Sequence, residues 1–271
     1  MADALLVAKA VSKVYRQRRG VFAFRSPRAI IQAVDHVDCA LAPGERLGLV
    51  GESGCGKSTL AKLLVGLIPL TSGEVLVHGE RLHALRGRPL RALRRRIQLI
   101  FQDPMNSLNP LMTVEEILSE PLIIHQLARG AARSTRVDEL LASVQLPAAY
   151  RPRLPRQLSG GERQRVGIAR ALATAPEVLI CDEPIASLDV SVGAQLLELL
   201  RALSQQRRMA LLFISHDLRA VASLCERIAV MRHGRFVETG RCEELLEHPR
   251  HPYTELLIRS AALDLETRPE T

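Results

Sequence analysis

The chain has 271 residues, of which 47% are hydrophobic, so it is long enough for one large globular domain with a well-buried core. Its longest apolar runs, such as residues 63–70, are far shorter than the ~20 residues needed to cross a bilayer, and residues 1–10 lack the features of a secretory signal. The net charge of +8 is compatible with nucleic acid, an anionic membrane face or nucleotide phosphates as a partner, but an aromatic content of 3% argues against a surface that stacks single-stranded bases.

The first fifty residues predict three strands. Residues 5–15 predict the first strand, and the basic, irregular stretch 16–31 is interpreted as a loop insertion. Apolar residues partly alternate with polar ones over residues 34–41, which indicates a half-buried antiparallel strand. The apolar run 46–50 follows a Pro-Gly turn and predicts a buried strand.

A glycine-rich segment, residues 51–59, lies between that strand and the helical pattern of residues 60–67. Strand, glycine-rich turn and helix are the context that a phosphate-binding loop requires, because backbone N–H groups and a helix N-terminus then face an anion. Lys57 is expected to reach the β- and γ-phosphates, and the Ser58 hydroxyl to be a ligand of Mg²⁺. An ordinary glycine-rich turn is the alternative. The residues assigned to ATP are Gly51, Ser53, Gly54, Cys55, Gly56, Lys57, Ser58 and Thr59.

Two further strands, at residues 74–78 and 97–101, flank an arginine-rich segment, residues 81–96. Leucines recur in this segment at helix-like spacing between the arginines. We interpret it as a solvated helix face with a packed aliphatic side; contact with an acidic partner or with lipid headgroups is the alternative. The seven arginines are Arg81, Arg86, Arg88, Arg91, Arg94, Arg95 and Arg96.

Residues 103–157 differ in character from what precedes them. The segment opens with a loop rich in Pro and Asn, continues with helical patterns around 114–124 and 137–144, and ends among prolines. We interpret it as a helical lobe inserted into a single α/β domain, with residues 1–102 and 158–271 forming the core and its antiparallel β part. The second half predicts helices at 158–171 and 195–203, strands at 178–181 and 211–214, and a hairpin at 228–231 and 235–238.

Polar residues stand where several of these strands end. Asp182 and Glu183 follow an apolar strand, where one carboxylate can anchor Mg²⁺ and the other can polarise a water molecule. Gln102 and His216 also follow strands, and the carboxyl ends of parallel strands meet at one edge of a sheet. We expect Gln102 to contact the metal or the attacking water and His216 to contact the γ-phosphate. A purely structural histidine is the alternative.

The cysteines are odd in number and form no CxxC pair, which favours reduced thiols in the cytosol over a disulfide framework or a zinc site. Cys55, inside the glycine-rich segment, is interpreted as a small residue tolerated there, with redox sensitivity as the alternative. The five cysteines are Cys39, Cys55, Cys181, Cys225 and Cys242.

Together these motifs resemble the nucleotide-binding subunits of ABC transporters, in the order of that family and over nearly the whole chain. The residues that carry the resemblance are 51–59, Gln102, the signature 158–165, 178–183, the D-loop 187–189, His216 and Tyr15. The resemblance implies the ABC ATPase fold: an α/β RecA-like P-loop core, an N-terminal antiparallel β part and an inserted helical lobe. It implies ATP and Mg²⁺ as cofactors, with Glu183 as general base and Ser58, Gln102 and Asp182 around the metal.

By the same resemblance, two such subunits bind two ATP molecules head to tail. Ser159, Gly160, Gly161 and Glu162 of one subunit would then face the γ-phosphate held by its partner, with Asp189 beside them. Tyr15 would stack on adenine. Glu162 stands where many relatives carry Gln, and we expect little effect on hydrolysis.

Finer resemblance, at residues 102–110, 187–192 and 248–254, points to the dipeptide, oligopeptide and nickel importer branch. It implies a second ATPase subunit that is a paralogue, transmembrane permease subunits, an indirect link to a solute-binding protein, and a peripheral location on the cytoplasmic face of the cell (inner) membrane. The cysteine-rich extension that can hold an iron–sulfur cluster in some members is not seen here, so no cluster is expected.

Three other functions compete with this one. A soluble ABC ATPase acting on nucleic acid is supported only by the positive charge, and we expect no nucleic-acid partner. An exporter subunit would differ only in the branch-level motifs. A nucleotide-binding module without turnover would have lost its base or its signature, yet Glu183, His216 and Ser159 are present.

Overall fold

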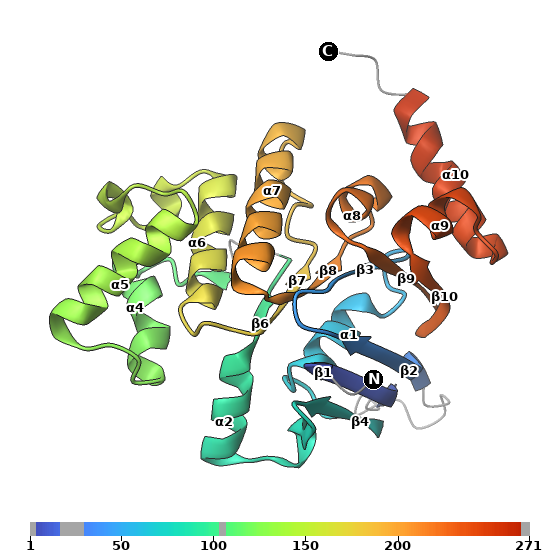
Figure 1. Cartoon of the computed structure of the whole chain (residues 1–271), viewed down its shortest axis with the longest axis horizontal. Coiled ribbons are helices and arrows are strands. Elements are labelled where there is room, and N and C mark those ends of the chain that lie inside the picture. Colours follow the sequence, from blue (N-terminus) through green and yellow to red (C-terminus); the bar gives the residue numbers. More distant parts are fainter. Residues whose placement is uncertain (1–3, 17–29, 103–106, 267–271) are drawn as a thin grey trace, which may run out of the picture.

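The computed structural model describes residues 4–16, 30–102 and 107–266. Two sheets form its centre: a four-stranded antiparallel sheet in the order β2-β1-β4-β5 and a six-stranded sheet in the order β10-β9-β3-β8-β7-β6 (Figure 1). In the larger sheet β9, β3, β8, β7 and β6 are parallel, and β10 pairs with β9 in the antiparallel direction. Its strands are β3 (Arg46–Val50), β6 (Ile97–Ile100), β7 (Val178–Asp182), β8 (Ala210–Ile214), β9 (Arg227–Arg232) and β10 (Arg235–Arg241).

Side-chain alternation along the six-stranded sheet creates two separate cores. In β8, for example, Leu211 and Phe213 join one apolar cluster, whereas Leu212 and Ile214 join the other. Because successive side chains of a strand point to opposite faces, strands buried on both faces read as continuous apolar runs. The first core joins the sheet to α6 (Gly160–Leu172), α7 (Val190–Arg207) and α8 (Leu218–Leu224); the second joins it to α1 (Lys57–Leu64) and the antiparallel sheet.

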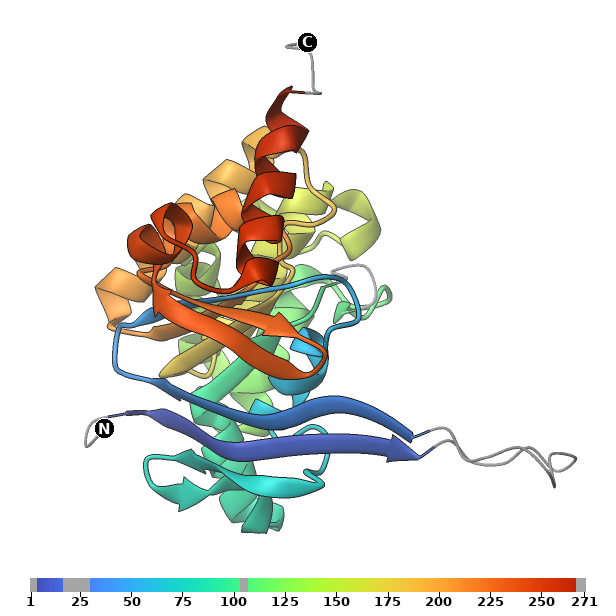
Figure 2. The same cartoon turned by 90° about the vertical axis from the view of Figure 1, so that its right-hand side faces the viewer.

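The antiparallel sheet consists of β1 (Leu6–Arg16), β2 (Ile30–Leu41), β4 (Ser72–Val77) and β5 (Glu80–Arg81). Figure 2 shows β1 and β2 running side by side along one edge of the molecule, away from the C-terminal helix. The interpretation of residues 16–31 as a loop is wrong at both ends, because Arg16 pairs with Ile30 and Tyr15 with Ile31 in this sheet. Residues 17–29 lie outside the described residues.

The helical part is formed by α4 (Val114–Ile124), α5 (Gly130–Ser143) and α6, which pack on one another at one end of the molecule (Figure 1). Thr113 starts α4 with a capping box, in which its hydroxyl accepts the N–H of Glu116 and the Glu116 carboxylate accepts the N–H of Thr113. Arg151 ties the loop after α5 to both helices through Glu115 at 2.6 Å and Asp138 at 3.1 Å.

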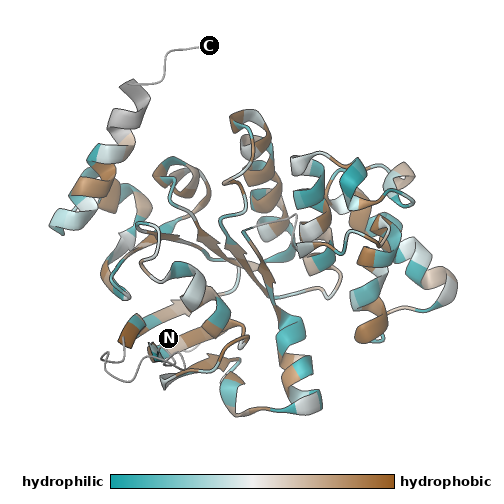
Figure 3. Cartoon of the chain, turned by 180° about the vertical axis from the view of Figure 1, so that it is seen from behind, coloured by the Kyte–Doolittle hydropathy of each residue, from teal (hydrophilic) through white to brown (hydrophobic). Residues whose placement is uncertain are grey.

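The remaining helices are α2 (Gly87–Arg96), α9 (Cys242–Glu247) and α10 (Pro252–Glu266), with short 3₁₀ turns at Leu82–Ala84, Ala148–Tyr150 and Pro155–Gln157. Figure 3 shows the central strands as largely hydrophobic and α2 as largely hydrophilic. Within the described ranges, no helix combines the length and the apolar character that crossing a membrane would take.

Candidate functional site

The glycine-rich segment turns through left-handed backbone at Gly54 (φ 80°) and Gly56 (φ 115°) before α1 begins at Lys57. A Cβ atom on Gly56 would lie 2.1 Å from the Ala33 carbonyl oxygen, so only glycine fits this close approach of β2. The Gly234 N–H donates to the Cys55 carbonyl at 2.8 Å and fixes the other side of the loop. The predicted strand, turn and helix are therefore present in the expected order.

Lys57 is 5% exposed and its ammonium group is enclosed by its own loop. Nζ donates hydrogen bonds to the carbonyl oxygens of Gly51 at 2.7 Å and Glu52 at 2.9 Å. The first backbone N–H groups of a helix lack partners within the helix, so α1 presents N–H donors beside a buried cation. This combination is suited to a polyphosphate.

Ser58 and Asp182 connect α1 to the end of β7: the Ser58 hydroxyl donates to Asp182 Oδ1 at 3.0 Å. Burial raises the pKa of Asp182, so a nearby cation would stabilise its ionised form. Hydroxyl, carboxylate and amide oxygens fit Mg²⁺, which usually takes one or two carboxylates together with substrate phosphates. Among the residues that the structure describes, no group of three or more His, Cys, Asp or Glu side chains could hold a metal ion.

Glu183 directly follows β7, and side chains that follow the neighbouring strands β6 and β8 lie against its carboxylate. Gln102 Nε2, after β6, donates to Glu183 Oε2 at 3.0 Å, and His216 Nδ1, after β8, lies 3.4 Å from the same oxygen. Glu183 has a left-handed backbone (φ 47°), which is strained for a residue with a side chain and is held by a hydrogen bond from its N–H to the Ile214 carbonyl at 2.9 Å. The expected convergence of Gln102, Glu183 and His216 is confirmed.

These groups face one cavity of about 640 Å³. Its walls are the phosphate loop and the start of α1, the strand ends around Glu183, residues 31–33 of β2, and the turn between β9 and β10. The lining residues are Ile31, Gln32, Ala33, Ser53, Gly54, Cys55, Gly56, Lys57, Ser58, Thr59, Gln102, Glu183, His216, His233 and Gly234. A cavity lined by a buried ammonium group and by a carboxylate with a histidine beside it can bind a nucleotide and orient water at its terminal phosphate.

Two predicted residues, Gly51 and Asp182, adjoin lining residues in sequence or by hydrogen bond but are not part of this lining. Three further predicted contacts, all in the described part of the chain, also lie outside it. Tyr15 is one strand away: it pairs with the lining residue Ile31, is 42% exposed, and has the Lys13 ammonium 5.1 Å from its ring centre. The signature at 159–162 and Asp189 are likewise absent from the lining. A role for these groups in nucleotide binding therefore requires either adenine stacking at the rim or a second subunit.

The signature begins α6 with a capping box. The Ser159 hydroxyl accepts the N–H of Glu162 at 3.2 Å, and Glu162 Oε2 accepts the N–H of Ser159 at 2.7 Å. The Tyr150 hydroxyl donates to the other oxygen of Glu162, and this bond lowers the pKa of the carboxyl group. Gly161 packs against α7 so closely that a Cβ atom would lie 2.5 Å from Val192 Cγ1. The start of α6 is thus rigidly placed.

Some site residues were not anticipated. His233 and Gly234 turn the β9–β10 hairpin with positive φ angles, and Gly234 was recognised only as a turn residue. Tyr253 was noted only within the 248–254 motif, yet its hydroxyl oxygen accepts the N–H of Glu52 in the phosphate loop at 3.0 Å. A local sequence pattern cannot predict a contact between residues that are 201 positions apart.

The arginine-rich segment packs as interpreted. Leu82 and Leu93 are buried, and Arg96 pairs with Glu177 at 2.6 Å. Four of its arginines also line a second cavity of about 720 Å³ beside the end of α4, together with His125. These four are Arg88, Arg91, Arg95 and Arg96.

Comparison with known proteins identifies the family. The profile of the ABC transporter family matches residues 34–186, and that of the oligopeptide/dipeptide transporter C-terminal region matches residues 237–266. The oligopeptide transport ATP-binding protein OppF of Bacillus subtilis (strain 168) is 48% identical over 89% of this chain and 79% of its own length. The putative oligopeptide transport ATP-binding protein YkfD of the same organism is 48% identical over 85% of this chain and 70% of its own.

Solved structures agree with this result. The dimeric ATP-binding cassette MJ0796 in a post-hydrolysis state with ADP and Pi matches with a TM-score of 0.76 and 31% identity, over 88% of this chain and 98% of that one. CbiO1 of Clostridium perfringens, at 24% identity, shares the fold with a TM-score of 0.76 over 97% and 96% of the two chains. The chain therefore belongs to the ABC transporter family, as an ATP-binding subunit with the ABC ATPase fold that hydrolyses ATP.

Proposed function

We propose that this ATPase powers the import of peptides through separate transmembrane permease subunits. The observation that carries the proposal is the match of residues 237–266 to the C-terminal region of oligopeptide and dipeptide transporters. The similarity to OppF and YkfD supports peptides as the cargo, and the names of these two relatives do not mention nickel.

In this proposal the phosphate loop, residues 51–59, binds the triphosphate. Lys57 exchanges its carbonyl partners for the β- and γ-phosphates, and Tyr15 stacks on adenine at the rim of the cavity. Ser58, Gln102 and Asp182 hold Mg²⁺, whose contribution is to neutralise phosphate charge.

Glu183 acts as the general base for the attacking water. Gln102 orients this carboxylate from one side, and His216 reaches the γ-phosphate from the other. The strained backbone of Glu183 supports the assignment, because strain of this kind is concentrated at functional sites.

The site is completed by a second ATPase subunit. Ser159, Gly160, Gly161, Glu162 and Asp189 lie outside the cavity of their own chain, and a helix N-terminus of this kind suits the phosphate of a neighbouring nucleotide. We propose a paralogue as that neighbour, in a complex at the cytoplasmic face of the cell membrane that receives cargo from a solute-binding protein. Residues 103–157 form the lobe that moves on closure, between the core segments 1–102 and 158–271.

Uptake in cells tests this function. Replacing Lys57 by Ala in the chromosomal gene is expected to abolish uptake of labelled short peptides and to leave uptake of radiolabelled nickel unchanged. The exposed Glu198→Gln variant serves as the control, since Glu198 forms an ion pair with Arg201 on the same helix, α7. Unchanged peptide uptake in the Lys57→Ala strain, loss of nickel uptake instead, or retention in that strain of a compound that the parent strain expels would contradict the proposal.

A further inference from the structure

The C-terminal region makes a direct contact with the ATP site. Tyr253, in the first turn of α10, is 2% exposed, and its hydroxyl oxygen accepts the backbone N–H of Glu52 at 3.0 Å. Glu52 is the second residue of the phosphate loop, and its carbonyl oxygen accepts the Lys57 ammonium at 2.9 Å. Tyr253 and Lys57 therefore hold the two polar backbone groups of the same loop residue.

A second contact fixes the ring of Tyr253. The guanidinium carbon of Arg232 lies 4.7 Å from the ring centre, which is a cation–π distance. Arg232 ends β9 directly before the turn residues His233 and Gly234, and both of these line the ATP cavity. Tyr253 thus contacts the phosphate loop through its hydroxyl group and, through its ring, the residue that precedes the β9–β10 turn.

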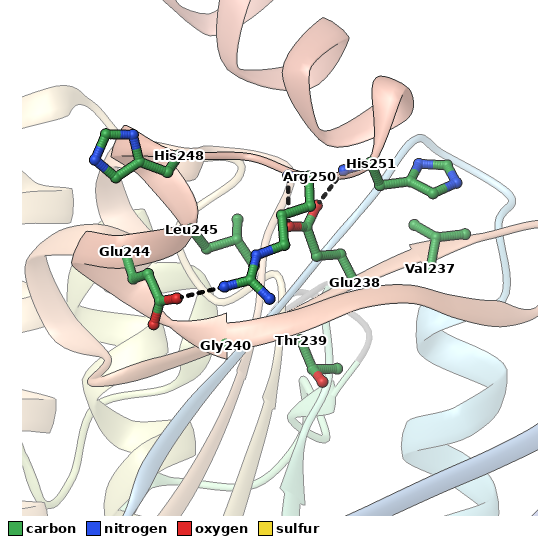
Figure 4. A pocket seen from close by; sticks show the side chains of 9 residues that line it. All are labelled: Val237, Glu238, Thr239, Gly240, Glu244, Leu245, His248, Arg250 and His251. Atoms are coloured by element: carbon green, nitrogen blue, oxygen red, sulfur yellow. Dashed lines mark hydrogen bonds and ion pairs between the residues drawn. The ribbon is translucent and has the colours of Figure 1, made fainter.

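The segment that carries Tyr253 is anchored on β10, as Figure 4 shows. One oxygen of Glu238 accepts the N–H of Arg250 at 2.8 Å, and the other accepts the N–H of His251 at 3.1 Å. His251 Nδ1 in turn accepts the N–H of Tyr253 at 3.1 Å and caps the start of α10. An unbroken series of hydrogen bonds runs from β10 to the phosphate loop.

We propose that Tyr253 is a positioning residue for ATP binding, and that the C-terminal region marked by residues 237–266 thereby contributes to the ATP site. The inference depends on the ATPase activity of the family and not on the nature of the cargo. Removing the hydroxyl leaves the Glu52 N–H without its partner beside a buried loop, and the loop then has to be ordered when the nucleotide binds.

The test uses Tyr253→Phe, which removes one oxygen atom and keeps the ring beside Arg232. The full-length chain is expected to bind Mg·ATP about three- to tenfold more weakly by isothermal titration calorimetry, the loss typical of one hydrogen bond. In the assembled transporter, KM for ATP should rise by the same factor while kcat stays within about twofold, because the loop holds the phosphates before and during reaction. Hydrogen exchange in the peptide that contains Glu52 should be faster.

Two further variants separate positioning from general stability. Glu255→Gln breaks the exposed ion pair with Arg259 on the same helix, and it should change neither KM nor the hydrogen exchange of the Glu52 peptide. Glu238→Gln leaves one acceptor oxygen for two N–H groups, so it should raise KM in the same direction by a smaller factor. Unchanged ATP affinity in Tyr253→Phe, with or without a lower melting temperature, would reduce Tyr253 to a structural anchor and overturn the inference. A transporter whose ATPase activity did not respond to peptides would contradict the proposed cargo. The ATP affinity, KM and hydrogen exchange of the Tyr253→Phe variant could still be measured and interpreted.

Discussion

Gln102 Nε2 lies 3.0 Å from Glu183 Oε2, so side chains 81 residues apart share a single hydrogen bond at the ATP cavity. Gln102 directly precedes the segment 103–157, and Glu183 directly follows β7, whose last residue is Asp182. A displacement of the helical lobe would therefore change the partner of the proposed base, which offers a direct physical link between lobe movement and hydrolysis.

Replacement of Glu183 by Gln keeps an acceptor oxygen for Gln102 but removes the base. Steady-state ATP hydrolysis is expected to fall about a hundred- to ten-thousandfold, the range for a general base, while ATP binding is retained. Phosphate release and calorimetric titration of the same preparation provide the measurement. Turnover equal to that of the parent would show that another group activates the water.

Gly161→Ala tests the packing of α6 on α7. The added Cβ would lie 2.5 Å from Val192 Cγ1, so the free energy of unfolding should fall by about 1–3 kcal/mol. The double variant with Val192→Ala should recover much of this loss in urea denaturation. Gly167→Ala, in the same helix with no atom within 4 Å of the new Cβ, should stabilise the protein by up to about 1 kcal/mol. An equal loss in both glycine variants would mean that the contact with Val192 is not the cause.

The signature carboxylate predicts a response to acid. The Tyr150 hydroxyl lowers the pKa of Glu162 below its ordinary value of 4.5, so the stabilisation from this group is present above pH 4.5 and is lost as pH falls through the folded-state pKa. In Glu162→Gln the contribution of this carboxyl group to the pH dependence of the free energy of unfolding should disappear. The free energies of unfolding of the variant and the parent protein should therefore converge in acid. ATPase activity should stay within about twofold, because Gln completes a capping box as Glu does. Urea denaturation at neutral pH and below pH 4.5 provides the comparison.

The thiols predict slow chemical modification of the native protein. None of the five cysteines, all of which lie in described segments, is paired in a disulfide; burial raises the pKa of Cys39 to about 12 and also raises the pKa values of Cys181 and Cys225. Because the thiolate is the reactive form, reaction with a thiol reagent should be slow at neutral pH and faster as pH rises. In denaturant all five should react promptly. Rapid native modification at Cys55 that ATP fails to slow would contradict its place in the ATP cavity.

Prediction from sequence succeeded for the buried strand before the glycine-rich segment and for the polar residues that follow the parallel strands. The strand expected at residues 46–50 has the bounds Arg46–Val50, and the residues expected at strand ends converge because β6, β7 and β8 are parallel neighbours. The helix expected at 60–67 instead runs from Lys57 to Leu64: the left-handed turn at Gly56 precedes it, and Gly66, with a φ of 66°, follows its end.

Other features depend on contacts far apart in sequence. Helices α8, α9 and α10 were not predicted; the first two have 7 and 6 residues, too few to show a clear period. The contact between Tyr253 and Glu52 exists only because β9, β10 and α10 fold back beside β3, which no local pattern encodes. The roles given to Tyr15, Asp189 and the signature stay predictions, since they concern a nucleotide and a second subunit.

The enclosed position of Lys57 has a consequence for how quickly the site can fill. Its ammonium group has already left water, since it is bonded to two loop carbonyls and is 5% exposed. When a triphosphate binds, the Lys57 ammonium group does not have to lose water. It exchanges the carbonyl oxygens of Gly51 and Glu52 for phosphate oxygens. The slow step of capture should be the shedding of water by the nucleotide and its magnesium ion, and the association rate should respond to the identity of the divalent ion more than to changes at the protein surface.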